Sequence, residues 1–169
     1  YKIKLHEIAD CKASELGHYV PNIIEMEPDE KIVYAVPTLD YHGDLLFVFE
    51  NGKGARVSMK CYETKTNRKK LIKAYCDKSP LNGIMYLRED KQVVIETTGG
   101  RYLLIDTAQV SPKAMKDTQG VACVTVKKNQ KISALRDYNE GEFVKASRYK
   151  AKNLPSAGAV LSNEDVMKK

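Results

Sequence analysis

Short apolar runs that alternate with polar residues dominate the chain, and they predict an all-β fold. The clearest pattern covers residues 45–59, where two apolar, β-branched or aromatic runs flank Asn51-Gly52. An Asn-Gly pair accepts the positive φ angles of a tight turn, so this segment predicts a β-hairpin. Residues 60–71, which follow at once, are rich in lysine. The basic unit is therefore a hairpin followed by a cationic connection.

The same unit recurs along the chain. Residues 93–105 carry Gly99-Gly100 at the turn, and residues 109–116 supply a basic segment behind them. A weaker copy covers residues 132–152, and residues 1–5 occupy the place of a second hairpin strand. A period of roughly 40 to 50 residues made of short strands is typical of propeller-like arrays. The alternative is an ordinary antiparallel β domain whose hairpins recur by chance.

These copies define the expected domain organisation. One domain is expected over residues 1–162, with a tail over residues 163–169. Its repeats are expected near residues 1–50, 51–98, 99–140 and 141–162, which corresponds to roughly three to four blades. Because the first copy begins inside a hairpin, we expect a partial or shortened disc, cut from a longer polypeptide.

Alternation also predicts strands between the hairpins. Residues 1–8, 22–24 and 31–36 have the apolar and β-branched content of strands. Pro21 is expected to close the irregular segment before the second of these strands.

The composition indicates a folded protein with an anionic partner. Hydrophobic residues make up 43% of the chain, and the formal net charge is +6 with a pI of about 9.0. The four cysteines form no C-x-x-C pair and do not cluster with the three histidines, which argues against a zinc site or a disulfide framework. No run of about 18 apolar residues is present, so no membrane partner is expected. We expect no catalytic, cofactor or metal-binding residue.

The candidate binding residues are the cations of the basic connections. The densest group lies within one connection and consists of Lys65, Arg68, Lys69, Lys70 and Lys73. A second group, beside the turns and in the later connections, consists of Arg56, Arg101, Lys113, Lys116, Lys127, Lys128, Arg148, Lys150 and Lys152. A row of cations on one surface gains affinity for a polyanion by releasing its condensed counterions, without reading sequence. For any single lysine, a solvated surface charge is the alternative.

The residues from Phe47 to Lys53, then Ala55-Arg56-Val57 and the stretch from Tyr62 to Lys70, resemble a known repeat. They are similar to the repeats of the C-terminal domain of the A subunit of bacterial type IIA topoisomerases, DNA gyrase and topoisomerase IV. The resemblance implies a β-pinwheel, a propeller-like disc of four-stranded blades in which a strand crosses between neighbouring blades. It also implies an accessory role, which is to bend and wrap duplex DNA and so direct supercoiling or the selection of DNA crossings.

The resemblance carries further expectations. The cleavage tyrosine of that family lies in a separate N-terminal region, and ATP and Mg²⁺ are used by other domains, so this domain is expected to have no active site. The implied partners are double-stranded DNA, the remainder of the A subunit and the ATPase B subunit. The implied location is the bacterial cytoplasm, at the nucleoid. Gyrase carries a Q-R-R-G-G-K-G box in the connection of its first blade, and residues 12–17, 66–70 and 114–120 here do not match it. If the chain begins in the first blade, that difference favours the topoisomerase IV type or a divergent paralogue. If earlier blades have been cut away, the difference says nothing about the type. The alternative function is a β-propeller module that binds another protein through its loops.

Overall fold

Two β-hairpins with the predicted turns organise the computed structural model, which describes residues 1–65 and 69–166. The first hairpin pairs β1 (Asp44–Phe49) with β2 (Lys53–Ser58), and the second pairs β4 (Gln92–Thr97) with β5 (Arg101–Asp106). Gly52 and Gly100 have φ angles of 84° and 68°, in the left-handed region that these tight turns require.

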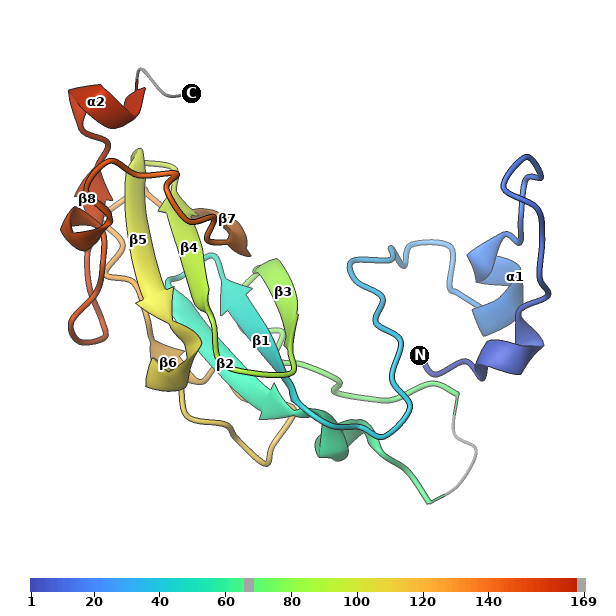
Figure 1. Cartoon of the computed structure of the whole chain (residues 1–169). Coiled ribbons are helices and arrows are strands. Elements are labelled where there is room, and N and C mark those ends of the chain that lie inside the picture. The colour runs from blue at the N-terminus through green and yellow to red at the C-terminus, as the bar shows by residue number, and fades with distance from the viewer. Residues whose placement is uncertain (66–68, 167–169) are drawn as a thin grey trace.

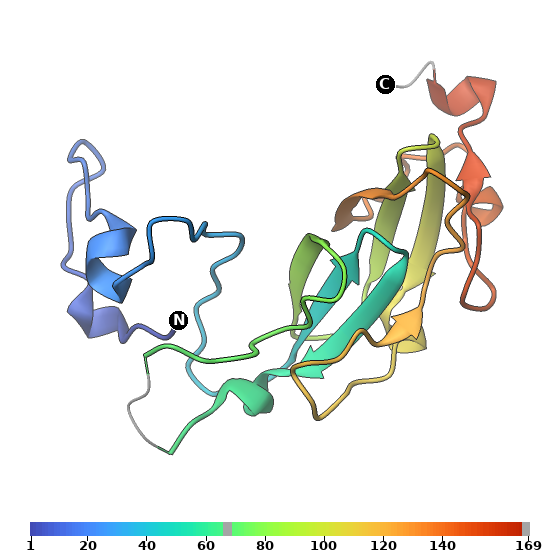
Figure 2. The ribbon, with the colours of Figure 1, turned by 180° about the vertical axis from the view of Figure 1, so that it is seen from behind.

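Each hairpin is extended on both sides into a four-stranded antiparallel sheet (Figures 1 and 2). The first sheet has the order β3-β1-β2-β6, with β3 (Leu81–Leu87) and β6 (Val121–Ala122) at its edges. The second sheet has the order β7-β4-β5-β8, with β7 (Ile132–Asp137) and β8 (Ala159–Val160) at its edges. Strand β6 follows β5 in the chain but pairs with β2, so a strand crosses from one sheet to its neighbour. The predicted all-β fold of the pinwheel kind is confirmed.

The main core lies between the two sheets. Leu46 and Val48 of β1 meet Val93 and Ile95 of β4 there, and all four side chains are fully buried. Burial of one such aliphatic side chain contributes roughly 1.5–3 kcal/mol, so this layer joins the sheets firmly. Strands β3 and β7 contact each other across the layer, whereas β6 and β8 lie at the far edges of their sheets.

The outer face of each sheet is covered by connecting segments. On the first sheet, Phe47 and Phe49 pack under Val36 and Tyr62. On the second sheet, Phe143 from the segment after β7 and Tyr149, which follows η4 (Ala146–Arg148), cover Val94 and Leu104. Both faces of both sheets therefore bury apolar side chains, which explains why β1 and β4 read as continuous apolar runs.

The N-terminal segment differs from the prediction. The described residues form two sheets rather than three to four blades, and residues 1–43 contain only the short helices η1 (Leu5–Glu7) and α1 (Val20–Ile24). The strands predicted at residues 1–8, 22–24 and 31–36 are thus wrong. Pro21 lies in the first turn of α1, where its fixed φ angle favours a helix, and a strand-like sequence needs a neighbouring strand to pair with.

The C-terminal segment also differs. Residues 132–137 form β7, but no partner strand follows to complete the third predicted hairpin; a turn and η4 follow instead. The expected tail contains α2 (Asn163–Val166), in which Asp165 is buried and accepts hydrogen bonds from the Val144 N–H and the Ser162 hydroxyl. Within residues 1–65 and 69–166, no helix has the length and apolar character needed to cross a bilayer.

Candidate nucleic-acid interface

Three lysine-bearing segments lie beside successive units of the fold, and we call them link 1 (residues 69–73), link 2 (residues 113–116) and link 3 (residues 148–152). Link 1 follows η2 (Met59–Tyr62) after β2, and link 2 follows η3 (Thr107–Gln109) after β5. Link 3 begins at the last residue of η4 and precedes β8. In Figure 1 the links follow one another from right to left around the lower and left sides of the sheets.

Link 2 is held against β2 by backbone and side-chain hydrogen bonds. The Lys113 N–H donates to the Arg56 carbonyl at 2.7 Å, and the Ser58 N–H donates to the Lys113 carbonyl at 3.3 Å. The Cys61 thiol of η2 donates to the Ala114 carbonyl at 3.2 Å. The link backbone is therefore fixed, while the Lys113 side chain extends into solvent.

Link 3 is held against β5 in a closely similar way. The Leu104 N–H donates to the Tyr149 carbonyl, and the Ala151 N–H donates to the Leu104 carbonyl, both at 2.8 Å. The Gln109 amide of η3 donates to the carbonyls of Ala151 at 3.4 Å and Lys152 at 3.2 Å. In each case a side chain of the short helix after a hairpin pins the link of the next unit. An open hollow beside η3 is lined by Lys150 and Lys152.

The lysines of links 2 and 3 are available to an external anion. In the part of the chain that the structure describes, neither Lys113 nor Lys116 nor the lysines of link 3 form an ion pair within 4.0 Å. The Lys116 ammonium lies 5.8 Å from the centre of the Tyr62 ring, which orients it without neutralising it. Lys60 on η2 is exposed beside link 2, although it is not among the candidates predicted from the sequence. Its position next to link 2 depends on the contact between Cys61 and the Ala114 carbonyl, which the sequence does not reveal.

The lysines of link 1 are in a different electrostatic environment. Lys69 lies 3.7 Å from Glu7, and Lys70 lies 3.1 Å from Glu30 and 3.7 Å from Glu27. Lys65 and Lys73 are exposed, whereas Arg68 lies outside the described residues. The densest cluster in the sequence is thus the one that acidic side chains neutralise most.

Arg56 joins the two sheets and does not lie on an exposed rim. Its side chain is only 12% exposed, and its guanidinium forms ion pairs of 2.6 Å with both Asp44 and Asp90. It also donates to the Thr107 carbonyl at 3.1 Å. The sequence placed Arg56 among the phosphate contacts, but both of its carboxylate partners are within the protein, so the structure gives it a structural role.

The remaining candidates are split between the two ends of the second sheet. Arg101 donates to the Gly158 carbonyl at 2.8 Å, and Arg148 is exposed within link 3. Lys127 and Lys128 lie on an exposed turn whose residue Lys131 pairs with Thr98, beside the hairpin turn of β4 and β5. Link 3 contacts η3 at the other end of β5, so Lys127 and Lys128 are not grouped with links 2 and 3.

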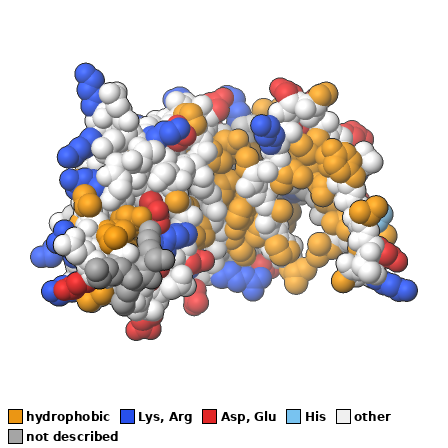
Figure 3. Space-filling view, turned by 90° about the horizontal axis from the view of Figure 1, so that it is seen from above, with side chains coloured by type: hydrophobic (Ala, Val, Ile, Leu, Met, Phe, Trp, Pro, Cys, Tyr) orange, Lys and Arg blue, Asp and Glu red, His pale blue; other side chains and the backbone are white. Residues whose placement is uncertain are grey.

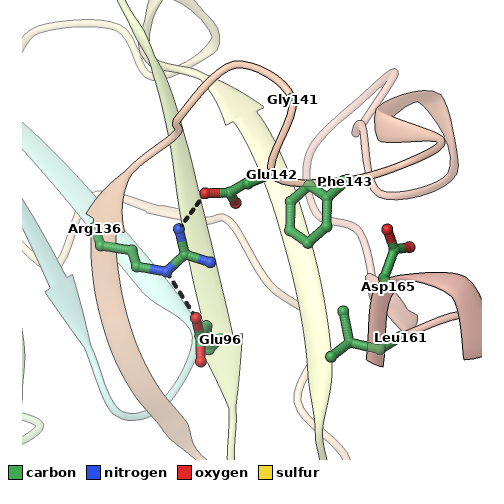
Figure 4. A pocket seen from close by; sticks show the side chains of 7 residues that line it. All are labelled: Glu96, Arg136, Gly141, Glu142, Phe143, Leu161 and Asp165. Atoms are coloured by element: carbon green, nitrogen blue, oxygen red, sulfur yellow. Dashed lines mark hydrogen bonds and ion pairs between the residues drawn. The ribbon is translucent and has the colours of Figure 1, made fainter. Parts of the chain in front are cut away.

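A cavity of about 440 Å³ on the outer face of the second sheet does not suit a polyanion (Figure 4). Arg136 lies in it between Glu96 at 2.8 Å and Glu142 at 2.7 Å, and the carboxylate of Asp165 faces the same space. Two carboxylates around one guanidinium give a local negative charge. Figure 3 shows lysine and arginine side chains in blue spread over the end that carries the second sheet, and hydrophobic side chains in orange over the end that carries residues 1–43.

The comparisons with known proteins fit this architecture. No family model matches the chain. It is 23% identical over 145 residues to the A subunit of DNA topoisomerase 4 from Staphylococcus aureus (strain MSSA476), which is 84% of this chain and 18% of that protein. The corresponding protein of Staphylococcus epidermidis (strain ATCC 12228 / FDA PCI 1200) also matches at 23% identity, with the same two coverages of 84% and 18%.

Solved structures with a similar fold are C-terminal domains of topoisomerases of this kind. The C-terminal domain of DNA topoisomerase IV matches with a TM-score of 0.77 and 22% identity over 92% of this chain and 53% of that chain. The C-terminal domain of DNA gyrase A matches with a TM-score of 0.64 and 16% identity over 94% of this chain and 55% of that chain. The chain spans about half of these domains and less than a fifth of the curated relatives. It therefore has the β-pinwheel fold of the C-terminal domains of topoisomerase IV and gyrase A subunits, which confirms the resemblance seen in its sequence.

Proposed function

We propose that this domain binds and bends or wraps duplex DNA without sequence specificity, as an accessory domain of a type IIA topoisomerase A subunit. The observation that carries the proposal is the repetition of links 2 and 3. Each presents lysines without an ion pair among the described residues, from a backbone pinned to the second strand of a hairpin. Fixed backbone positions reduce the entropy that the protein loses when a polyanion binds.

The energetics require several links to act together. Smooth bending of a site of 20–30 base pairs costs on the order of 1–6 kcal/mol, which one or two exposed lysines do not offset. Counterion release grows with each phosphate that is neutralised, so links on successive sheets add their contributions along one DNA path. Lys60 beside link 2 and Arg148 within link 3 extend the same path.

The proposal includes the wider setting of the domain. The chemistry of cleavage and of ATP hydrolysis would lie in the B subunit or in other regions of the A subunit, and the domain would hold a DNA segment against them in the bacterial cytoplasm. Its contribution to the isomerase would be to influence which DNA crossing is passed through the break.

A matched pair of variants tests the interface. Lys150→Ala with Lys152→Ala removes two charges from link 3, and Lys127→Ala with Lys128→Ala removes two from the opposite end of the same sheet. We expect the first pair to weaken duplex binding about tenfold at 0.15 M salt and to reduce the slope of log K against log salt by roughly 1 to 2. The second pair should change affinity less than about threefold. Equal losses from both pairs, measured by fluorescence anisotropy, would contradict the assignment of the path.

Wrapping is tested separately from binding. Nicked circles religated with the domain bound should show a change in linking number that the Lys150→Ala, Lys152→Ala variant reduces.

The second candidate function, a protein-binding module, is favoured by the exposed apolar side chains Leu16, Tyr19 and Leu39. Protein binding that does not respond to salt, without DNA binding, would support that alternative.

A further inference from the structure

Link 1 differs from the other two links because the N-terminal segment lies against it. The Lys2 N–H donates to the Lys69 carbonyl at 2.7 Å, and the Lys2 ammonium contacts the Thr64 hydroxyl. This backbone contact brings the acidic side chains of residues 7–30 to the lysines of link 1. Glu7 then pairs with Lys69, and both Glu27 and Glu30 pair with Lys70.

Glu30 is held in place by partners other than Lys70. It accepts hydrogen bonds from the Tyr1 hydroxyl and, at 2.9 Å, from the Glu27 N–H. The hydrogen bond from Tyr1, then that from the Glu27 backbone, then that from Lys70, lower the pKa of Glu30 to about 2. Glu30 therefore keeps its negative charge at every pH at which DNA binding is ordinarily measured.

The ammonium of Lys70 also lies near an aromatic ring. It lies 5.3 Å from the centre of the Tyr1 ring, so Tyr1 contacts both members of the Lys70–Glu30 pair. Links 2 and 3 have no comparable acidic cover among the described residues. The three cationic links are thus unequal, and the inequality comes from one segment of the chain.

We propose that the acidic side chains of the N-terminal segment mask link 1 by competing with DNA phosphates for Lys69 and Lys70. The inference rests on the proposed DNA-binding function and assigns a regulation to its surface. DNA engages links 2 and 3 first, and it reaches link 1 only where Glu7, Glu27 and Glu30 are displaced.

The mask is weak enough to be displaced. The side chains of Lys69 and Lys70 are 53% and 50% exposed, and ion pairs at such exposed sites change an equilibrium by about fivefold at most. Mobile ions screen them further, with a Debye length of about 8 Å at 0.15 M salt. The masking effect should therefore be largest at low salt and decline as salt is added.

The test compares two variants that remove the same charge from the same segment. Glu27→Gln with Glu30→Gln removes two carboxylates that pair with Lys70, whereas Glu25→Gln with Asp29→Asn removes two exposed acids that form no ion pair among the described residues. Both variants remove two negative charges from the same segment, so they reduce its long-range repulsion of DNA equally. The difference between their affinities for DNA therefore measures the effect of the pairing with Lys70. We expect the first variant to bind a 30-base-pair duplex about three- to tenfold more tightly than the unmodified chain at low salt, and the second to gain less than about twofold.

A third background locates the effect on the link. In a chain that carries Lys69→Ala and Lys70→Ala, the Glu27→Gln, Glu30→Gln change should gain no more than the control change does. The mask is overturned if the unmodified chain binds duplex and the two acid variants bind equally, or if the gain persists without the lysines. A chain that binds no duplex in any arm would instead overturn the proposed function and the mask with it, so the two failures are distinguishable.

Discussion

Replacement of Arg56 by methionine should destabilise the fold while leaving DNA affinity almost unchanged. Arg56 on β2 is paired with Asp44 on β1 and with Asp90 in the turn before β4, and it also contacts the Thr107 carbonyl after β5. The guanidinium thus links the first sheet, through Asp44, to the second sheet, through Asp90 and Thr107. Methionine fills a similar volume but leaves the Asp44 carboxylate without its partner.

The magnitude follows from the exposure of the two carboxylates. The Asp44 side chain is 13% exposed, so the loss of its partner approaches the roughly 3–5 kcal/mol measured for buried pairs, and we take about 2–3 kcal/mol because some solvent remains. The Asp90 side chain is 48% exposed, and the loss of that pair costs at most about 1 kcal/mol. The sum is about 3 kcal/mol, which lowers the Tm of a chain of this size by roughly 6–12 °C.

Thermal unfolding followed by circular dichroism measures the effect, and Arg88→Met is the matched control. Arg88 is exposed and forms no ion pair among the residues that the structure describes, so its replacement should change stability by less than about 0.5 kcal/mol. DNA affinity measured well below both Tm values should agree within about twofold for the two variants. An unchanged Tm with a tenfold loss of affinity for Arg56→Met would refute the structural role and restore Arg56 as a phosphate contact.

Two further predictions concern the backbone and an acidic residue. An alanine at Gly120 (φ 70°) would place its Cβ well inside the van der Waals contact distance of the Gly54 carbonyl oxygen, so Gly120→Ala should lower the free energy of unfolding by about 3 kcal/mol. At Gly141 (φ 81°) a Cβ would meet nothing within 4 Å, so Gly141→Ala should lower it by only about 1 kcal/mol. Urea unfolding measures both values. Equal costs would show that the contact with Gly54 is unimportant. The lowered pKa of Glu30 means that its contribution to stability is present above pH 4.5 and lost as pH falls towards 2. Carboxyl NMR titration should show this pKa rising in Tyr1→Phe, and an identical titration in both chains would rule out the Tyr1 hydroxyl as the main cause.

Features that depend on a few adjacent residues were predictable from the sequence. Asn51-Gly52 and Gly99-Gly100 predict the two hairpin turns because positive φ angles are a local property of those residues. The apolar runs on either side predict the strands, since burial on both faces of a sheet needs apolar residues at consecutive positions. The recurrence of a hairpin with a cationic connection then indicates repetition along the chain.

The N-terminal segment shows where this reasoning stops. Residues 31–36 have a strand-like composition, but β structure requires a paired neighbour, and among the described residues none forms a ladder with them. Pro21 ends an extended segment or begins a helix with equal ease, and in the folded chain it begins a helix that buries Ile24. Local composition alone could not decide either case.

The sequence by itself determined that the chain would form β-hairpins and carry a net positive charge, because both follow from residue type and immediate neighbours. Only the tertiary structure decided which cations are paired with acidic side chains of the protein itself. Arg56 forms ion pairs with Asp44 and Asp90, and Lys70 forms ion pairs with Glu27 and Glu30, although these partners are distant in sequence. An ion pair depends on where two side chains meet in space, and that position is set by the pairing of strands and the packing of segments far apart along the chain.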